Sequence, residues 1–213
     1  MTSSAQRQEI TRLCKRMHAD GLGVGSAGNM SVRDGDRVLI TPRGIDYDVL
    51  EPEMLCVVDL DGTPLQSDCT PSTDTSMHLA VYRGSDVGSV VHTHSRDAAA
   101  VGNVTDELPL VHYLMADLGG TVTVVPYGPT ASPEVQERIL GALDGRFAAL
   151  LGNHGALTVG DTLDDAHRRA VYLEWVAGVY AVSRSLARPA LLSDEHLKEV
   201  NQLLEGYFQE GRT

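Results

Sequence analysis

Helical stripes and short apolar runs alternate along most of this sequence. Apolar residues recur at helical spacing at positions 10, 13, 14 and 17, which predicts an amphipathic helix over 8–20. Further helices are predicted over 48–53, 72–82, 96–101, 132–143, 161–187 and from 193 onward, and strands over 30–32, 37–41, 55–60, around 90–91, 121–125 and 146–151. Strands and helices alternate through the middle and helices close the chain, so we expect one α/β domain over residues 1–213.

Length and charge restrict the class of protein. The chain has 213 residues, enough for one large domain with a real core. Its formal net charge of −12 argues against nucleic acid or an anionic membrane as a partner. The sequence has no apolar run of the roughly eighteen residues that a membrane span needs. Residues 1–9 also lack the apolar core of a secretion signal.

The cysteines favour a reducing compartment. Cys14, Cys56 and Cys69 are odd in number and widely spaced, and they form neither a C-x-x-C metal motif nor an evident disulfide framework. We therefore expect a cytoplasmic protein without disulfides. Cys14 lies on the apolar stripe of the first predicted helix, where it should be part of the core.

Two histidines end a predicted strand. In His92-Thr93-His94 the two imidazoles point the same way, because side chains alternate in an extended chain. The two histidines lie about 6.5–7 Å apart along the backbone, so their imidazoles can converge on one metal ion. The alternative is one packed and one exposed histidine. His154 follows a second apolar run and a turn. Three histidines suit zinc in a catalytic site, where the fourth position stays open.

Three segments are candidates for binding an anion. The glycine-rich stretch 21–29 allows backbone N–H groups to turn towards one point, although an ordinary flexible turn explains it equally well. A second tight turn lies at 41–44. The third candidate is the start of the helix predicted over 72–82, which Ser72 or Thr73 could cap. On that helix we expect His78 to face neighbouring packing rather than a metal.

Six motifs follow one another along the chain. They are Gly-Ser-Ala-Gly-Asn-Met-Ser-Val-Arg at 25–33, Ile-Thr-Pro-Arg-Gly-Ile at 40–45, Pro-Ser-Thr-Asp-Thr at 71–75, Val-His-Thr-His-Ser at 91–95, Leu-Gly-Asn-His-Gly at 151–155 and Leu-Ser-Asp-Glu at 192–195. In this order they resemble the metal-dependent class II aldolases of the fuculose-1-phosphate aldolase type, a superfamily that also holds ribulose-phosphate 4-epimerase and the adducin head domain. The resemblance implies a three-layer fold with a central, mainly antiparallel β-sheet flanked by helices.

The resemblance also implies a site and an assembly. His92, His94 and His154 would bind zinc, one ion per subunit, with other divalent metals as alternatives. The substrate phosphate would be held by side chains and backbone N–H groups at Ser26, Gly28, Asn29, Gly44, Ser72 and Thr73. Arg43 replaces the usual small hydroxyl residue and either contacts the phosphate or faces solvent. Members of this kind form homotetramers with sites at subunit interfaces, where Tyr113 and Tyr207 match tyrosines from a neighbouring subunit.

Aldol cleavage needs a group that stabilises the electron pair of the breaking carbon–carbon bond. The lysines of this chain, Lys15 and Lys198, lie on the first and last predicted helices, so we do not expect a Schiff base. Zinc can instead bind the C2 carbonyl and C3 oxygen of a ketose 1-phosphate and stabilise the enediolate of dihydroxyacetone phosphate. Asp74 is the candidate base for the C3 proton and a candidate fourth metal ligand. Tyr113 or Tyr207 would be the acid at the aldehyde oxygen.

Two aspartates depart from the aldolase pattern. Aldolases have Glu in place of Asp74 and a small apolar residue in place of Asp117, whereas both aspartates match the 4-epimerase branch; Tyr113 matches the aldolases. We expect reversible retro-aldol cleavage of a fuculose, ribulose or 5-deoxyribulose 1-phosphate. Epimerisation at C4 of a pentulose 5-phosphate is the alternative, and decarboxylation of a phosphorylated 3-oxo acid is a third. A non-catalytic adducin-like module predicts lost metal ligands, and all three histidines are present.

Overall fold

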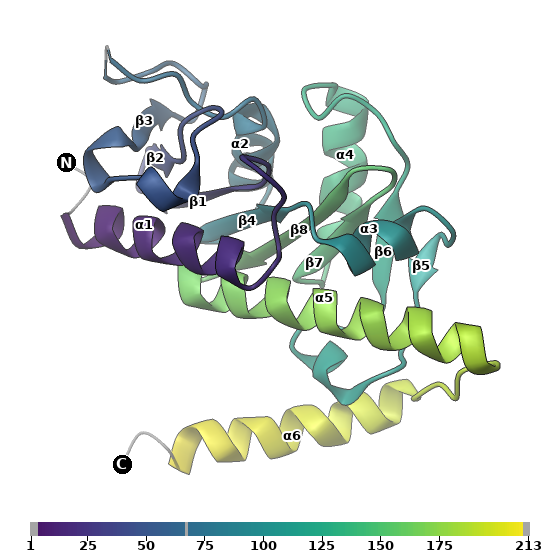
Figure 1. The fold of residues 1–213 in the computed structure, drawn as a ribbon. Helices are drawn as coiled ribbons and strands as arrows, with labels where there is room; N and C mark the ends of the chain where they lie inside the picture. Colours follow the sequence, from purple (N-terminus) through teal and green to yellow (C-terminus); the bar gives the residue numbers. More distant parts are fainter. Residues whose placement is uncertain (1–3, 67, 211–213) are drawn as a thin grey trace.

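An eight-stranded sheet runs through the molecule (Figure 1). The computed structural model describes residues 4–66 and 68–210. On the last helix it describes the side chains only up to residue 200 and at residues 202 and 203. The strands lie in the order β3-β2-β1-β4-β8-β7-β6-β5, and all neighbours are antiparallel except the parallel pair β6 and β7. They are β1 (Asn29–Asp34), β2 (Arg37–Ile40), β3 (Cys56–Asp59), β4 (Ser89–Thr93), β5 (Glu107–Leu108), β6 (Val122–Val125), β7 (Ala148–Leu151) and β8 (Gly155–Gly160).

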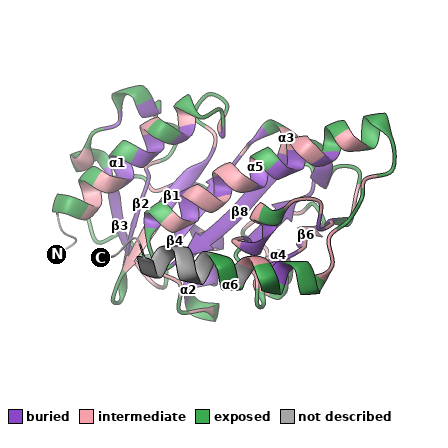
Figure 2. Ribbon diagram, turned by 90° about the horizontal axis from the view of Figure 1, so that it is seen from below, coloured by how far each residue is buried: buried purple, intermediate pink, exposed green. Residues whose placement is uncertain are grey.

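Helices cover both faces of this sheet, which confirms the predicted three-layer α/β architecture. On one face α1 and α5 pack over β1 and β4, around Met30 and Val91, and Figure 2 shows the two helices crossing the strands side by side. On the other face α2 and α4 pack around Val90 and Leu157. The helices are α1 (Ser4–Ala19), α2 (Thr75–Gly84), α3 (Arg96–Gly102), α4 (Pro133–Leu143), α5 (Leu163–Leu186) and α6 (Asp194–Glu210), with 3-10 turns η1 (Tyr47–Val49), η2 (Pro52–Met54) and η3 (Tyr113–Ala116).

Local sequence explains where the two helices after β6 and β8 begin. Pro133 occupies the first turn of α4, where its missing N–H costs nothing. Thr162 caps α5, because its hydroxyl accepts a hydrogen bond from the backbone N–H of Asp165 at 3.2 Å. None of the helices in the described ranges is long and apolar enough to cross a membrane.

Several elements differ from the sequence-based expectation. The helix predicted over 48–53 is the pair of 3-10 turns η1 and η2, and the short elements β5 and η3 were not predicted. Strand β8 was not predicted, although it lies in the middle of the sheet between β4 and β7. Helix α2 begins at Thr75 rather than at 72, because Ser72 forms a turn in which its Oγ accepts the N–H of Asp74 at 3.2 Å. The three residues before α2 are therefore a loop that faces the site described below.

The expectation of a chain without disulfides is wrong in this structure, because Cys56 and Cys69 form a disulfide. After β3 the chain turns and runs back beside it, so that the N–H of Leu65 donates to the carbonyl of Val57 at 2.8 Å. This return brings the two Cα atoms to 5.5 Å, although 13 positions separate them in sequence. Cys14 is free and buried on α1, as predicted.

Candidate active site

His92, His94 and His154 form one cluster at the end of β4. Their ligating nitrogen atoms all lie within 4.8 Å of one another, and Nε2 of His92 lies 3.0 Å from Nε2 of His94. His92 is the last but one residue of β4 and His94 follows the strand. The period of two in an extended chain therefore brings these imidazoles together, as the H-x-H spacing predicts.

The turn between β7 and β8 places His154 beside the other two histidines. Asn153 adopts a φ of 54°, and its N–H donates to Oδ1 of Asn103 at 2.8 Å. Gly155 begins β8 against β4, so closely that a Cβ on this glycine would overlap the carbonyl oxygen of Thr93. Only glycine allows this approach, which carries the preceding His154 to His94.

The three histidines fit a divalent metal ion. Nδ1 of His92 donates to the carbonyl oxygen of Ala156 at 2.9 Å, which fixes the tautomer and leaves the Nε2 lone pair facing the cluster. Burial lowers the pKa of His92 to about 3 and also lowers the pKa of His94, so both rings are neutral at pH 7. Neutral imidazoles with converging ring nitrogens are the donor set that zinc and similar ions take.

Asp74 lies next to this cluster as a carboxylate. Its Oδ2 accepts a hydrogen bond from Nδ2 of Asn29 at 2.9 Å and lies 3.9 Å from Nε2 of His92, while its Oδ1 accepts from Oγ1 of Thr130 at 3.0 Å. Burial alone would raise the pKa of Asp74, but His92 and the two hydrogen bonds outweigh it and lower this pKa. Asp74 is thus an ionised, oriented base.

A cavity of about 340 Å³ joins the histidines to the three candidate anion segments. His94, His154 and Asp74 line one part of it. All the residues predicted to bind phosphate also line it, namely Ser26, Gly28, Asn29, Arg43, Gly44, Ser72 and Thr73. Segments far apart in sequence therefore meet at one concave site.

Backbone hydrogen bonds hold two of these segments together. The N–H of Ser72 donates to the carbonyl of Thr41 at 3.1 Å, and the N–H of Arg43 donates to the carbonyl of Thr70 at 2.9 Å. These two N–H groups are used within the protein, so Ser72 and Arg43 can offer a phosphate their side chains. Gly44 has a φ of 67°, which explains the glycine that ends the second turn.

Comparison with known proteins identifies the family. The sequence model described as "Class II Aldolase and Adducin N-terminal domain" matches residues 8–181. The chain belongs to this class II aldolase family. It is 32% identical to 5-deoxy-D-ribulose 1-phosphate aldolase of Bacillus thuringiensis serovar kurstaki over 99% of its length and 100% of the relative's. It is also 32% identical to L-fuculose phosphate aldolase of Escherichia coli K12, over 94% of each protein.

A solved structure agrees with these relatives. An L-fuculose 1-phosphate aldolase superposes with a TM-score of 0.91 and 29% identity, covering 96% of this chain and 98% of that one. The predicted family and fold are therefore confirmed, and the protein is an aldolase-family enzyme.

Of the other predicted catalytic residues, two lie apart from the cavity and one has a side chain outside the described part of the chain. Tyr113 begins η3, is 52% exposed and packs its ring against His112, with 4.7 Å between ring centroids. Tyr207 falls on α6, among the residues whose side chains lie outside the described part of the chain. Asp117 accepts a hydrogen bond from Arg168 at 2.9 Å and lies 3.5 Å from Arg169. Neither Tyr113 nor Asp117 lines this cavity.

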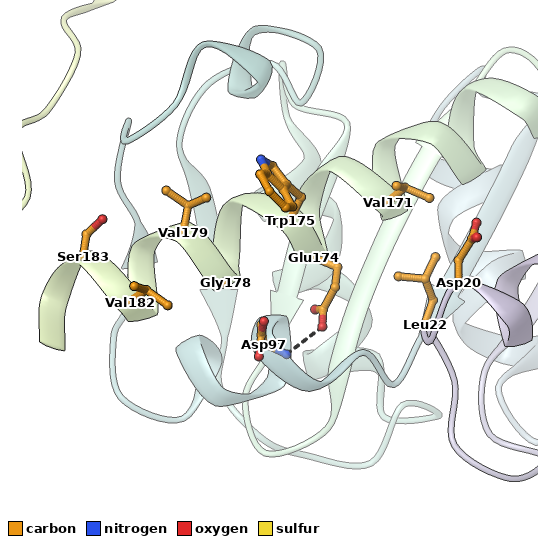
Figure 3. A pocket seen from close by; sticks show the side chains of 10 residues that line it. All are labelled: Asp20, Leu22, Asp97, Val171, Glu174, Trp175, Gly178, Val179, Val182 and Ser183. Carbon is orange, nitrogen blue, oxygen red and sulfur yellow. Dashed lines mark hydrogen bonds between the residues drawn. The ribbon is translucent and has the colours of Figure 1, made fainter.

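A larger hollow of about 530 Å³ lies along α5 but carries no comparable chemistry (Figure 3). Its lining includes Trp175 and other apolar side chains and contains no histidine. One acidic residue in its lining, Glu174, accepts hydrogen bonds from the N–H groups of Asp97 and Ala98 at 2.9 and 2.8 Å. Those bonds cap the start of α3 and use both oxygens of this carboxylate.

The sequence-based prediction missed Thr130 and the contacts of His78. Thr130 lies in the loop before α4, and nothing in its local sequence indicates that it binds a carboxylate 56 positions away. His78 does pack within the protein, as predicted, but it bonds Asn29 at 2.6 Å. Asp74, His78 and Tyr82 recur every four positions, and this regular spacing of polar groups along a helix with an apolar middle was the available clue.

Proposed function

We propose that this protein catalyses reversible retro-aldol cleavage of a ketose 1-phosphate to dihydroxyacetone phosphate and a small aldehyde. The observation that carries the proposal is the shared cavity, which is lined by His94 and His154 of the histidine cluster, by Asp74 and by the predicted phosphate-binding residues. The names of the relatives support a substrate of the 5-deoxyribulose or fuculose 1-phosphate class. Residues 1–213 act as one domain in this proposal.

The metal in this proposal is zinc, one ion per subunit, held by His92, His94 and His154, with another divalent ion as the alternative. A metal ion there supplies a Lewis acid for the carbonyl and hydroxyl oxygens of the substrate. Asp74 lies close enough to the cluster to act as a further ligand before substrate binds, because its Oδ2 is 3.9 Å from Nε2 of His92.

Asp74 moves the C3 proton, removing it in condensation and returning it in cleavage. Its lowered pKa keeps the carboxylate form available at neutral pH. Hydrogen bonds from Asn29 and Thr130 fix the side chain from two sides, so the shorter aspartate is held in one orientation. Proton transfer by a positioned carboxylate is worth about 10²–10⁴ in rate.

The phosphate lies among the hydroxyls of Ser26, Ser72 and Thr73, with Arg43 as the cation at the rim. All four residues line the cavity, and Arg43 is exposed. Oriented hydroxyls and one guanidinium can bind a dianion within a chain whose net charge is −12.

The acid at the aldehyde oxygen comes from a second subunit. Tyr113 is half-exposed and does not line the cavity of its own chain, so its role requires a neighbouring copy in a homotetramer. In this proposal Tyr207 also comes from that neighbouring copy. The protein acts in the cytoplasm, where phosphorylated sugars are metabolised. The Cys56–Cys69 disulfide opposes that placement, because disulfides persist mainly in oxidising compartments.

Epimerisation at C4 of a pentulose 5-phosphate is the second candidate, because Asp74 and Asp117 follow the epimerase pattern. In the single chain Asp117 is held by Arg168 and Arg169, so a catalytic role for it also needs a neighbouring subunit. The aldolase proposal is favoured by the relatives, which are named as aldolases of ketose phosphates and match this chain over nearly their whole length.

A coupled assay for dihydroxyacetone phosphate tests the proposal. Zinc-loaded protein is offered fuculose, ribulose and 5-deoxyribulose 1-phosphates, with ribulose 5-phosphate beside them and its product analysed for the C4 epimer. We expect triose phosphate from at least one ketose 1-phosphate. Epimer formation without triose release would assign the protein to the epimerase branch.

A further inference from the structure

A buried chain of hydrogen bonds runs from α2 through β1 to Asp74. The hydroxyl of Tyr82 lies 2.7 Å from Oγ of Ser31, which lies 2.7 Å from Nδ1 of His78. Nε2 of His78 lies 2.6 Å from Oδ1 of Asn29, whose Nδ2 donates to Asp74. The first four of these residues are at most 4% exposed.

The periods of a helix and a strand bring these groups together. Asp74, directly before α2, and His78 and Tyr82 on α2 are spaced by four residues and lie on one face of the helix. Asn29 and Ser31 are spaced by two and share one face of β1. The two sets interleave, so that each polar side chain of the helix reaches one from the strand.

The two ends of the chain of bonds, Asp74 and Tyr82, require the same donor in each bond. A carboxylate only accepts, so Asn29 must direct its amide nitrogen to Asp74 and its oxygen to His78. His78 then donates from Nε2 and, being neutral because burial lowers its pKa to about 4, accepts at Nδ1 from Ser31. Burial raises the pKa of Tyr82, so its phenol keeps a proton to donate to Ser31.

We propose that Ser31 and His78 are positioning residues for the base, because they fix the orientation of the Asn29 amide that holds Asp74. This inference rests on the proposed role of Asp74. Without the donor on Ser31, His78 can take the other tautomer and present a lone pair to Asn29. The amide would then rotate and direct its oxygen at the carboxylate, which repels Asp74 from its working position.

Two other roles for His78 do not fit these contacts. Both ring nitrogens are occupied within the chain of bonds, so His78 has none to offer a metal ion. The ring is also completely buried, which separates it from the substrate cavity and from bulk water. Its influence on the reaction must therefore pass through Asn29.

A double-mutant cycle between Ser31→Ala and Asp74→Asn tests the inference. We expect Ser31→Ala to lower kcat about tenfold, the effect of one misplaced hydrogen bond, with a change in KM of under about twofold. If Ser31 acts only through Asp74, adding Ser31→Ala to Asp74→Asn should cost no further activity. Equal fold losses in both backgrounds would overturn the inference.

The matched control is Ser89→Ala. Ser89 is a buried serine on β4 that pairs in register with Val32, so it faces the opposite side of the sheet from Ser31. We expect its kcat to equal that of the wild type. A loss of kcat as large as that of Ser31→Ala would assign the effect to general destabilisation and overturn the positioning role.

A measurement without substrate separates this inference from the proposed reaction. Nitrogen-15 NMR of labelled histidine reports which ring nitrogen carries the proton. We expect His78 to be protonated at Nε2 in the wild type and in Ser89→Ala, and at Nδ1 or in a mixture in Ser31→Ala. A wild-type His78 protonated at Nδ1 would contradict the inference, whatever substrate the enzyme takes. The expected tautomers without triose release would contradict the proposed reaction alone.

Discussion

Asn29 and Asp74 are joined by a hydrogen bond of 2.9 Å from Nδ2 to Oδ2, between the first residue of β1 and the residue before α2. Asn29 also pairs in register with His92 across the sheet. Asn29 thus links the carboxylate, through its side chain, to the strand that carries His92, through its backbone. Because Asn29 lines the cavity as well, the base and the phosphate segments are set by the same residue.

Replacing Asp74 with Asn should remove the base and leave the fold intact. The amide has nearly the same size but cannot take the C3 proton, so we expect kcat to fall by about 10²-fold or more. Steady-state kinetics on zinc-loaded protein measures this, with Asp86→Asn, an exposed carboxylate between α2 and β4, as the control. More than half of wild-type activity in Asp74→Asn would mean that another group carries the proton.

Replacing His94 with Ala should lower metal affinity and activity together. The loss leaves two of the three clustered imidazoles, and structural and catalytic zinc sites need three protein ligands or more. Metal content after dialysis should fall well below one ion per chain. His196→Ala, on exposed α6, should keep full content. Full zinc stoichiometry in His94→Ala would refute the ligand assignment.

Replacing Arg43 with Ala should weaken binding of the phosphate. We expect KM for the sugar phosphate to rise about fivefold, since an exposed guanidinium contributes a modest charge-assisted contact, while kcat stays close to wild type. Arg138→Ala on α4 is the control, because Arg138 is exposed and bonds Glu134. An unchanged KM would mean that Arg43 faces solvent in the complex.

The metal-free protein should lose stability as the pH falls from about 6.5 towards 4. Unfolded His78 takes up a proton near its ordinary pKa, whereas burial holds the folded pKa at about 4. Between these values the unfolded state binds more protons, so the free energy of unfolding decreases with decreasing pH, by about 2 kcal/mol from pH 6.5 to 5 for this group. Urea unfolding at both pH values should show that the free energy of unfolding depends less on pH in His78→Gln than in the wild type. An identical dependence would assign the effect to other groups.

The Cys56–Cys69 disulfide should stabilise the segment that leads into the phosphate site. Closing a loop of this size is worth about 3 kcal/mol, so reduction or Cys69→Ser should lower the melting temperature. Under denaturing conditions without reductant, thiol titration should detect only the cysteine at position 14. Three reactive thiols would show that the purified protein lacks the bond.

Local rules predicted the parts of this molecule that local sequence determines. The H-x-H spacing placed two histidines together because strand geometry has a period of two, and Pro133 and Thr162 marked the starts of helices correctly. Strand β8 was not predicted, because its run of four residues is bounded by glycines at 155 and 160 and resembles an extension of a turn.

The tertiary contacts could not be predicted in this way. Thr130 meets Asp74 across 56 positions, and the return of Cys69 to Cys56 depends on how a loop folds against β3. The motifs indicated which residues share a site but not which hydrogen bonds join them. The orientation of Asn29, which bonds both His78 and Asp74, follows only from the packing of α2 against β1.

Exchange of the C3 proton of dihydroxyacetone phosphate in deuterium oxide, without aldehyde, is the decisive measurement for Asp74 as the base. It isolates the proton transfer assigned to Asp74 from cleavage and from the identity of the aldehyde. Proton NMR should show deuterium at C3 with zinc-loaded wild type, and none after chelation or in Asp74→Asn. A triose phosphate that stays unlabelled with the zinc-loaded wild type would contradict the account.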